Sequence, residues 1–424
     1  MAIEDDVLVV GGGLAGCAAA LAAAGGGARV RLVSHKQSTL RNASGLVDVL
    51  GYVDERGPLV DPFDGFDALP AGHPYSTVDE TGVREGLALF DEAVGDAYAG
   101  EHTDRNALVP THGGTVKPTA RYPQSSAAGL ASRDGDVLLV GFEALPDFDA
   151  PLAADHLSAA GVPFEARGVT VAFPADLKAD AKVTRYAKVL EQDQPEARGD
   201  GEGGVRATLA ERVKPHLGGA ERVGFPAVLG DTEDAAVRAT LEDHLGAAVF
   251  EVPMGPPSLP GLRLEDRLYD AMREAGVRIS TGNPVVGYEA EGGRIEHVMM
   301  ERTHQRVPYT AAQYVLATGG LVGGGIDSDR ETVREPVFGC HVEYPADRYD
   351  WSEPAAFGDH AFARFGVSTD DELRPLDAAG EVAFENLRAA GAVLGGADFA
   401  AEKSGGGISL ATGTVAGRRA GELV

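Results

Sequence analysis

The fold of this chain is decided by Val7–Leu8–Val9–Val10–Gly11–Gly12–Gly13–Leu14–Ala15–Gly16. The apolar first part predicts a buried strand, and the alanine-rich run 17–24 that follows the glycines predicts a helix. Residues 29–33 (RVRLV) then predict a second strand. Strand, glycine turn, helix and strand in this order form the βαβ unit that binds the phosphates of a dinucleotide.

The glycines of this turn have different expected roles. Gly11 permits the tight turn, Gly13 lets the backbone approach a phosphate, and Gly16 lets the helix pack on the strand. The first helical residues, Leu14 and Ala15, then present free N–H groups to that phosphate. The alternative interpretation is a tight turn that binds no ligand.

The end of the second strand departs from the usual pattern of NAD-binding proteins. In that pattern an acidic residue holds the ribose hydroxyls of adenosine, whereas this chain has Ser34, followed by His35 and Lys36. A strand end with neutral or basic residues argues against NAD as the ligand and weakens the case for any ligand that contains adenine. Lys36 leaves NADP as an alternative, because a basic residue here can bind a 2′-phosphate.

The composition narrows the class of protein. The chain has 424 residues, enough for two domains or for one large domain with an insertion. Its formal net charge is −28, from 65 acidic and 37 basic residues, and only seven of the basic residues are lysines. We interpret this charge as a solvated acidic surface suited to a salt-rich cytoplasm, with a specific acidic binding face as the alternative. Nucleic acid and direct adsorption to an anionic membrane are both disfavoured.

Cysteine usage and hydropathy limit the chemistry and the location. Cys17 and Cys340 lack the spacing of metal ligands, so we expect no metal site and no iron–sulfur cluster. The acidic start is not a signal peptide, and no apolar run approaches the roughly 18 residues of a membrane span. We therefore expect a cytoplasmic protein that reaches a membrane only through partners.

Two polar segments are candidate parts of a ligand site. Ser44 and Gly45 lie just past the end of the second strand, where open α/β sheets bind ligands. The alternative is a helix start capped by Asn42 or Ser44. In the loop 111–123, Lys117 and Arg121 are candidates to bind an anion, unless this is a plain surface loop.

An insertion is predicted over residues 61–261. We expect it to be an α+β domain that contacts substrate or a partner. A charged, glycine-rich stretch at 192–204 is expected to be a mobile surface excursion. The predicted helices cover 81–100 and 149–160, and the predicted strands cover 136–142, 169–173, 224–230 and 248–252.

The residues after the insertion complete the first unit. A helix at 265–275 and a series of strands from 277 to 316 lead to Ala317–Thr318–Gly319–Gly320, a second turn that exposes its backbone. An apolar strand that ends in such a turn is typical of the second half of a two-dinucleotide-fold flavoprotein. Thr318 and Gly319 are therefore candidate cofactor contacts.

A third glycine turn lies near the C-terminus. Gly406 and Gly407 open a small-residue helix that runs to Ala420. We expect the N-terminus of this helix to face the electron-rich part of a flavin ring, and the alternative is a glycine-rich loop without a ligand. The fold class is thus α/β: a Rossmann-like flavin-binding domain of the two-dinucleotide-fold type, built from residues 1–60 and 262–424, with the α+β insertion between them.

Several short motifs of the chain occur together. They are residues 9–16, Gln37–Ser38, Ser44–Gly45 with Asp48, 257–263 (PSLPGLR), 317–320 (ATGG) and 334–339 (REPVFG). The glycine motifs occur in many flavoproteins, whereas the Gln-Ser…Ser-Gly and Arg-Glu-Pro segments are more particular. Together these motifs resemble one family, the B subunits of the anaerobic glycerol-3-phosphate dehydrogenase.

The resemblance implies a flavoprotein subunit that binds FMN, with FAD as the alternative. FMN agrees with Ser34, because it has no adenosine ribose to hold. The implied function is to help convert sn-glycerol 3-phosphate to dihydroxyacetone phosphate. The implied partners are a catalytic FAD subunit and an iron–sulfur subunit, which pass electrons to quinone at the inner face of the cell membrane.

Two other functions stay open, and no catalytic residue is assigned. The chain could be a self-sufficient FAD-dependent oxidoreductase, or a non-catalytic assembly subunit that uses its scaffold only to bind partners. His112, His341 and His360 are single histidines in the sequence. We expect each of them to be structural.

Overall fold

β1 (Ile3–Val10) lies in the middle of a sheet that has seven strands in the described part of the chain. The structure is a computed structural model and describes residues 3–36, 38–54, 56–100, 104–194, 204–302 and 305–424. β1 pairs in parallel with β2 (Val30–Ser34) and β14 (Gln305–Leu316). The sheet continues through β11 (Arg278–Thr281) beyond β2, and through β13 (Arg294–Arg302) and then β12 (Val285–Glu291) beyond β14. The short β17 (Leu387–Ala389) also pairs with β14, in parallel.

The alternating side chains of β1 contribute to two different hydrophobic cores. Val7 and Val9 are buried among four helices, and Leu8 and Val10 are buried with β13, β14 and the segment 326–394. This division follows from the two-residue period of a strand. The helices are α1 (Leu14–Gly25), α2 (Pro74–Val94), α7 (Leu259–Glu274) and α9 (Gly405–Glu422). The predicted strand–turn–helix–strand unit and the α/β class are confirmed.

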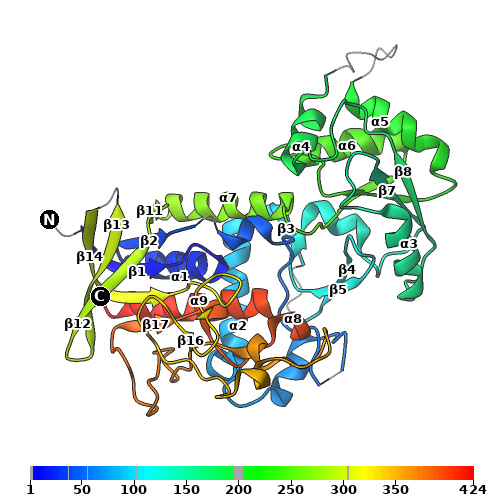
Figure 1. Cartoon of the computed structure of the whole chain (residues 1–424). Coiled ribbons are helices and arrows are strands. Elements are labelled where there is room, and N and C mark those ends of the chain that lie inside the picture. The colour runs from blue at the N-terminus through cyan, green and yellow to red at the C-terminus, as the bar shows by residue number, and fades with distance from the viewer. Residues whose placement is uncertain (1–2, 37, 55, 101–103, 195–203, 303–304) are drawn as a thin grey trace.

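Helices α1 and α9 lie side by side (Figure 1). Small residues face each other between them. A Cβ atom on Gly413 would lie 2.4 Å from the carbonyl oxygen of Ala15, and one on Gly417 would lie 2.1 Å from that of Ala19. The four-residue spacing places these positions on one face of each helix. The C-terminal helix therefore covers the helix that follows the first glycine turn.

The insertion contains a second sheet, which is parallel throughout. Its strand order is β10–β9–β7–β8, and helices connect the successive strands. This sheet is therefore of the α/β type, where the sequence predicts α+β, because each strand returns through a helix to pair in parallel. The elements are β7 (Val137–Phe142), α3 (Ala150–Ala159), β8 (Ala166–Val171), α4 (Val183–Gln192), α5 (Val205–Val213), β9 (Arg222–Pro226), α6 (Asp234–Leu245) and β10 (Ala248–Val252). Most of the predicted excursion at 192–204 lies outside the described residues.

Short elements connect the larger ones. The two-residue or four-residue strands are β3 (Tyr98–Ala99) with β6 (Tyr122–Pro123), β4 (Ala107–Pro110) with β5 (Val116–Thr119), and β15 (Asp327–Ser328) with β16 (Val333–Arg334). The remaining helices are α8 (Phe399–Glu402) and the 3₁₀ helices at 39–42 (η1), 62–68, 95–97, 124–129, 214–216, 348–351, 361–364 and 391–393. Among the described residues, no helix combines the length and the apolar character needed to cross a membrane.

Helix α2 belongs by sequence to the predicted insertion but packs on the other part of the chain. It begins at Pro74, before the predicted start at 81, and its Val83, Leu87 and Phe90 are buried with α1 and α9. The second sheet, in contrast, has a core of its own between residues 137 and 259, and Figure 1 shows these green elements set apart from the first sheet. The division into 1–60 with 262–424 and 61–261 stays a prediction.

A buried ion pair joins α7 to the second sheet. Arg263 of α7 donates to both carboxylate oxygens of Glu251 in β10, at 2.6 and 3.1 Å. Burial raises the pKa of Glu251, but the Arg263 guanidinium and the hydrogen bonds to the carboxylate outweigh burial and lower the pKa below its ordinary value. The N–H of Leu229 donates one of these bonds, at 2.7 Å.

We expect Arg263→Met to lower the free energy of unfolding by about 3 kcal/mol at neutral pH, because it leaves a buried carboxylate without its cation. In the native chain the pKa of Glu251 is lower in the folded state than in the unfolded state. The ionised carboxylate therefore stabilises the fold at a pH above its unfolded-state pKa, and this stabilisation is lost as the pH falls through its folded-state pKa. The variant loses the guanidinium, the largest cause that lowers this pKa, while burial still raises it, so the deficit should shrink as the pH falls from 7 to 5. Urea unfolding at both pH values measures this, with the exposed Arg267→Met on the same helix as the control. A deficit independent of pH would contradict it.

Candidate cofactor-binding site

Gly11 and Gly16 are required by the packing of the chain itself. Gly11 has a φ of +125°, and a Cβ atom there would lie 2.0 Å from the carbonyl oxygen of Ala317 at the end of β14. A Cβ atom on Gly16 would lie 2.0 Å from the carbonyl oxygen of Gly11. The turn is thus pressed against β14 on one side and against its own helix on the other.

Gly13 differs, because the described part of the chain leaves the space beside it empty. Its backbone is extended (φ −81°, ψ −174°), and a Cβ atom there would meet only Thr39 Oγ1, at 3.8 Å. No described side chain caps α1, which begins at the next residue, so the first N–H groups of this helix lack an acceptor from a side chain. A phosphate is the group that such a helix start attracts.

A cavity of about 270 Å³ opens beside this turn. Of the predicted site residues, Gly11, Gly13, Thr318 and Gly319 line it. Thr318 Oγ1 is buried and has no hydrogen-bond partner among the described residues. This hydroxyl and the open space at Gly13 fit a polar ligand that passes between the two turns.

The charge around this first cavity favours an anion. No acidic residue is among its described lining residues, although the chain has 65 of them, and Lys36 contributes a cation. Ser34 also lines it, but its hydroxyl donates to the backbone oxygen of Lys36 at 2.8 Å. The described lining therefore lacks the carboxylate of NAD-binding proteins, as the sequence predicts.

Leu14 and Ala15 lie outside the lining of this cavity. Ala15 is buried beneath α9, and Leu14 is partly buried against the helical core. The side chains of these two residues are used in packing. Any contact that they make with a cofactor is through the backbone N–H groups at the start of α1, which stays a prediction.

A second cavity, of about 770 Å³, lies on the far side of η1 (Thr39–Asn42). Four segments line it: residues 42–52, 111–117, 253–256 and 399–403. Ser44 is part of this lining, whereas Gly45 packs toward Pro260, whose Cβ would lie 2.8 Å from a Cβ added to the glycine. Helix η1 connects the two cavities, because Thr39 lines the first and Asn42 lines the second.

The helix cap in this region differs from the predicted alternative. Ser38, and neither Asn42 nor Ser44, caps η1 by accepting the N–H of Leu40 at 3.1 Å. Ser44 instead accepts the N–H of Leu46 at 3.4 Å within the turn. Its position in the lining of the second cavity is therefore compatible with a ligand role.

The N-terminus of α9 is occupied by the protein itself. The N–H of Gly406 donates to Asp48 Oδ1 at 2.7 Å, and the N–H of Gly407 donates to the backbone oxygen of Asp48 at 2.5 Å. A Cβ atom on Gly407 would lie 2.3 Å from Tyr75 Oη. Neither glycine lines either of the two cavities, so a contact with a flavin ring stays a prediction and requires Asp48 to give up these bonds.

The two basic residues of the loop 111–123 have different positions. Lys117 lines the second cavity and pairs with Asp48 at 2.8 Å. Arg121 is buried and holds both oxygens of Asp91 at 2.7 and 2.8 Å, so the prediction that Arg121 meets an anionic ligand is wrong. The sequence could not show this, because Asp91 lies on α2, thirty residues earlier.

Two residues of the second cavity are absent from the predicted site. His112 and Lys403 line it together with Lys117. Lysine is rare in this chain, and this rarity is the signal that could have indicated Lys403 from the sequence. Three of the seven lysines, Lys36, Lys117 and Lys403, line the two cavities. A chain that uses arginine almost everywhere else retains lysine at these positions.

A buried network lies behind Lys403. His73 Nε2 and Glu402 Oε2 are 3.1 Å apart, and Ser404 Oγ donates to the same oxygen at 2.7 Å. His73 Nδ1 accepts the N–H of Tyr75, which leaves the ring proton on Nε2 to donate to Glu402. Burial raises the pKa of Glu402, but the bonds from His73 and Ser404 outweigh burial and lower it. The residues on both sides of Lys403 are thereby held in place.

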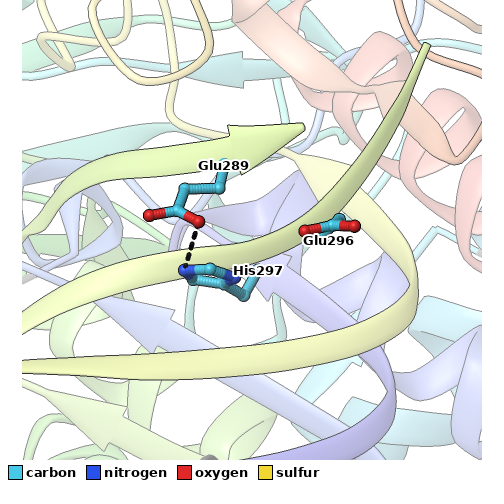
Figure 2. Close-up of side chains that lie close together, drawn as sticks. All are labelled: Glu289, Glu296 and His297. Carbon is cyan, nitrogen blue, oxygen red and sulfur yellow. Dashed lines mark ion pairs between the residues drawn. The ribbon is translucent and has the colours of Figure 1, made fainter. Parts of the chain in front are cut away.

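One group of potential metal ligands lies on the hairpin of β12 and β13 (Figure 2), and none of its three residues lines either cavity. Glu289 Oε2 and His297 Nε2 form a cross-strand pair at 3.7 Å, and Glu296 is the neighbour of His297 on β13. Both carboxylates are exposed. Exposed acidic groups of this kind are common without a metal, so the cluster assigns none.

Comparison with known proteins agrees with this geometry. Residues 6–409 match the FAD binding domain family. A protein of Halobacterium salinarum, named as a probable B subunit of the anaerobic glycerol-3-phosphate dehydrogenase, is 63% identical over 100% of this chain and 99% of its own length. The B subunit of the anaerobic glycerol-3-phosphate dehydrogenase of Yersinia pestis is 31% identical over 96% of this chain and 95% of its own length.

Solved structures show weaker similarity. E. coli quinol fumarate reductase matches with a TM-score of 0.45 and 11% identity, over 100% of this chain and 71% of that chain. The open conformation of a flavocytochrome c3 fumarate reductase matches with a TM-score of 0.42 and 11% identity, over 99% of this chain and 78% of that chain. Similarity at this level assigns no function.

We expect Gly13→Val to fold but to purify without flavin, because the branched side chain would fill the space beside the start of α1. Absorbance of the purified variant near the flavin bands, compared with its melting temperature, separates loss of cofactor from loss of fold. Gly287→Val in β12 is the matched control, since a Cβ atom there meets no described atom within 4 Å and the residue lines neither cavity. Stoichiometric flavin in Gly13→Val would show that the phosphate binds elsewhere.

Proposed function

Because the chain belongs to the FAD binding domain family and, over its whole length, to the family of anaerobic glycerol-3-phosphate dehydrogenase B subunits, we propose that it is a flavin-carrying subunit of a complex that oxidises sn-glycerol 3-phosphate to dihydroxyacetone phosphate. The observation that carries this proposal is the full-length match to relatives that bear this name. The first cavity, at the glycine turn before α1, and the second cavity, reached along η1, support this proposal as the place for the flavin. A bound flavin supplies two-electron oxidation chemistry, and the protein supplies binding and orientation.

We propose FAD as the cofactor, and the preference for FMN has no support from the family match. The phosphate cradle at Gly13 opens on the first cavity, and η1 leads from there to the second. FMN ends at its phosphate, so it would leave one of these cavities empty. FAD has a group on each side of its diphosphate and could extend into both. Ser34 then faces the adenosine half without a carboxylate to hold the ribose.

We expect acid denaturation of the purified chain to release FAD at about one molecule per chain, because one extended ligand then binds with its diphosphate at Gly13 and its flavin half along η1, beside the lysine-lined part of the second cavity. Chromatography of the released flavin against FAD and FMN standards measures this. Gly13→Val, treated in the same way, provides the background. Release of FMN alone would overturn the FAD assignment and leave the flavin assignment intact.

We propose that the subunit relays electrons to partners. A four-thiolate iron–sulfur cluster needs more cysteines than the two of this chain. Cys17 and Cys340 are both buried, and burial raises the pKa of each thiol, which keeps it in the neutral form. A catalytic FAD subunit and an iron–sulfur subunit would complete the path to quinone. We place the complex in the cytoplasm, at the inner face of the cell membrane.

We expect the flavin-loaded chain alone to reduce no quinone with glycerol 3-phosphate as the donor, and the reconstituted complex to do so, because the chain has no cluster to carry the electrons onward. Quinone reduction by the chain and by the complex measures this. Robust turnover by the chain alone, with quinone or a dye, would make it a self-sufficient oxidoreductase. A colourless chain that still supports the complex would make it an assembly subunit.

A further inference from the structure

We propose that the second cavity is an anion-binding site for a small phosphate monoester, so that this subunit itself binds the phosphate of its substrate through Lys403 and Lys117. The inference rests on the proposed function for the substrate class. The evidence for an anion site does not depend on that function, because it comes from the lining of the cavity and the charges of its residues. His112 and the hydroxyls of Thr111 and Thr115 contribute further hydrogen-bonding groups to the lining.

Lys403 is a cation without a counter-ion in the part of the chain that the structure describes. Its Nζ donates to the backbone oxygen of Ala400, and none of the described carboxylates lies within ion-pair distance of it. Lys117 in the same lining, in contrast, pairs with Asp48 at 2.8 Å. A cation that lines a cavity and meets no described carboxylate, in a chain of charge −28, is free to bind an anionic ligand.

The backbone at Lys403 has an unfavourable conformation for a lysine. Its φ of +54° and ψ of +60° lie in the left-handed region, at the end of α8, where glycine or asparagine is the usual residue. The network of His73, Glu402 and Ser404 holds the chain on both sides of it. A strained conformation with a charged side chain in a cavity wall is a pattern found at functional sites.

Lys117 lies in the same lining and is held by Asp48. One of its three N–H donors is used in the 2.8 Å ion pair, and the others have no acceptor among the described residues. Asp48 is shared with the N-terminus of α9, which fixes its position. Lys117 thus retains hydrogen-bonding capacity for an anion at a well-defined place.

The size and the polarity of the cavity agree with a phosphate on a small polar body. Its described lining contains two lysines, one histidine and one carboxylate, against the strongly negative surface of the whole chain. A local positive field of this kind attracts anions. Lysine binds phosphate as a point charge with several donors, and a phosphate monoester carries about two negative charges near neutral pH.

The test is titration calorimetry on the flavin-loaded full chain, without partners or electron acceptor. We expect glycerol 3-phosphate to bind, inorganic phosphate to compete with it, and glycerol to show no binding. Lys403→Met should weaken glycerol 3-phosphate binding about tenfold or more, because a charge-assisted bond is lost. Lys188→Met, an exposed lysine on α4 outside the lining, is the matched control and should bind like the native chain.

A second variant separates a binding role from a structural one. Lys403→Gly relieves the left-handed conformation, so it should not lower the melting temperature, yet it should weaken binding as much as Lys403→Met does. Native affinity in both variants, equal binding of glycerol, or absence of glycerol 3-phosphate binding to the native chain would overturn the proposal. Activity of the reconstituted complex reports separately on the proposed function, which stands if the complex oxidises substrate that this chain does not bind.

Discussion

The carboxylate of Asp48 joins three parts of the chain that are distant in sequence. It accepts the N–H of Gly406 at the start of α9 and pairs with Lys117 of β5, while the adjacent Val47 forms backbone hydrogen bonds with Arg121. A carboxylate at a helix N-terminus is favourable, because it compensates the partial positive charge of the unpaired N–H groups. Asp48 thereby closes the start of α9, positions one wall of the second cavity, and links β5 to the N-terminus of α9.

The N-termini of α1 and α9 differ in the groups that they meet. Both helices begin at glycine turns, but the start of α9 has a protein carboxylate and the start of α1 has no side-chain cap among the described residues. The empty space at Gly13 lies at the uncapped helix, beside a cavity whose described lining has no acidic residue. The difference between two similar glycine motifs is thus electrostatic: one is neutralised within the chain and the other is available to a ligand.

Small residues and rare lysines together define the two cavities. Gly413 and Gly417 bring α9 within van der Waals distance of α1, and this rigid pair supports the turn that borders the first cavity. On a strongly acidic protein, Lys36, Lys117 and Lys403 give the cavities a local charge opposite to that of the surface. Dense packing thus provides the shape of the site, and a few unusual cations provide its attraction for anions.

The sequence by itself determined the local features of this protein. The βαβ unit, the packing of Gly16 against Gly11, the missing acid at Ser34 and the family resemblance all follow from short stretches whose geometry depends on near neighbours. Only the tertiary structure decided which charges meet. Asp48 and Gly406 are 358 residues apart, Arg121 is taken by Asp91, and the insertion forms a parallel sheet. Such pairings depend on how distant segments approach in space, and no local pattern of residues encodes that approach.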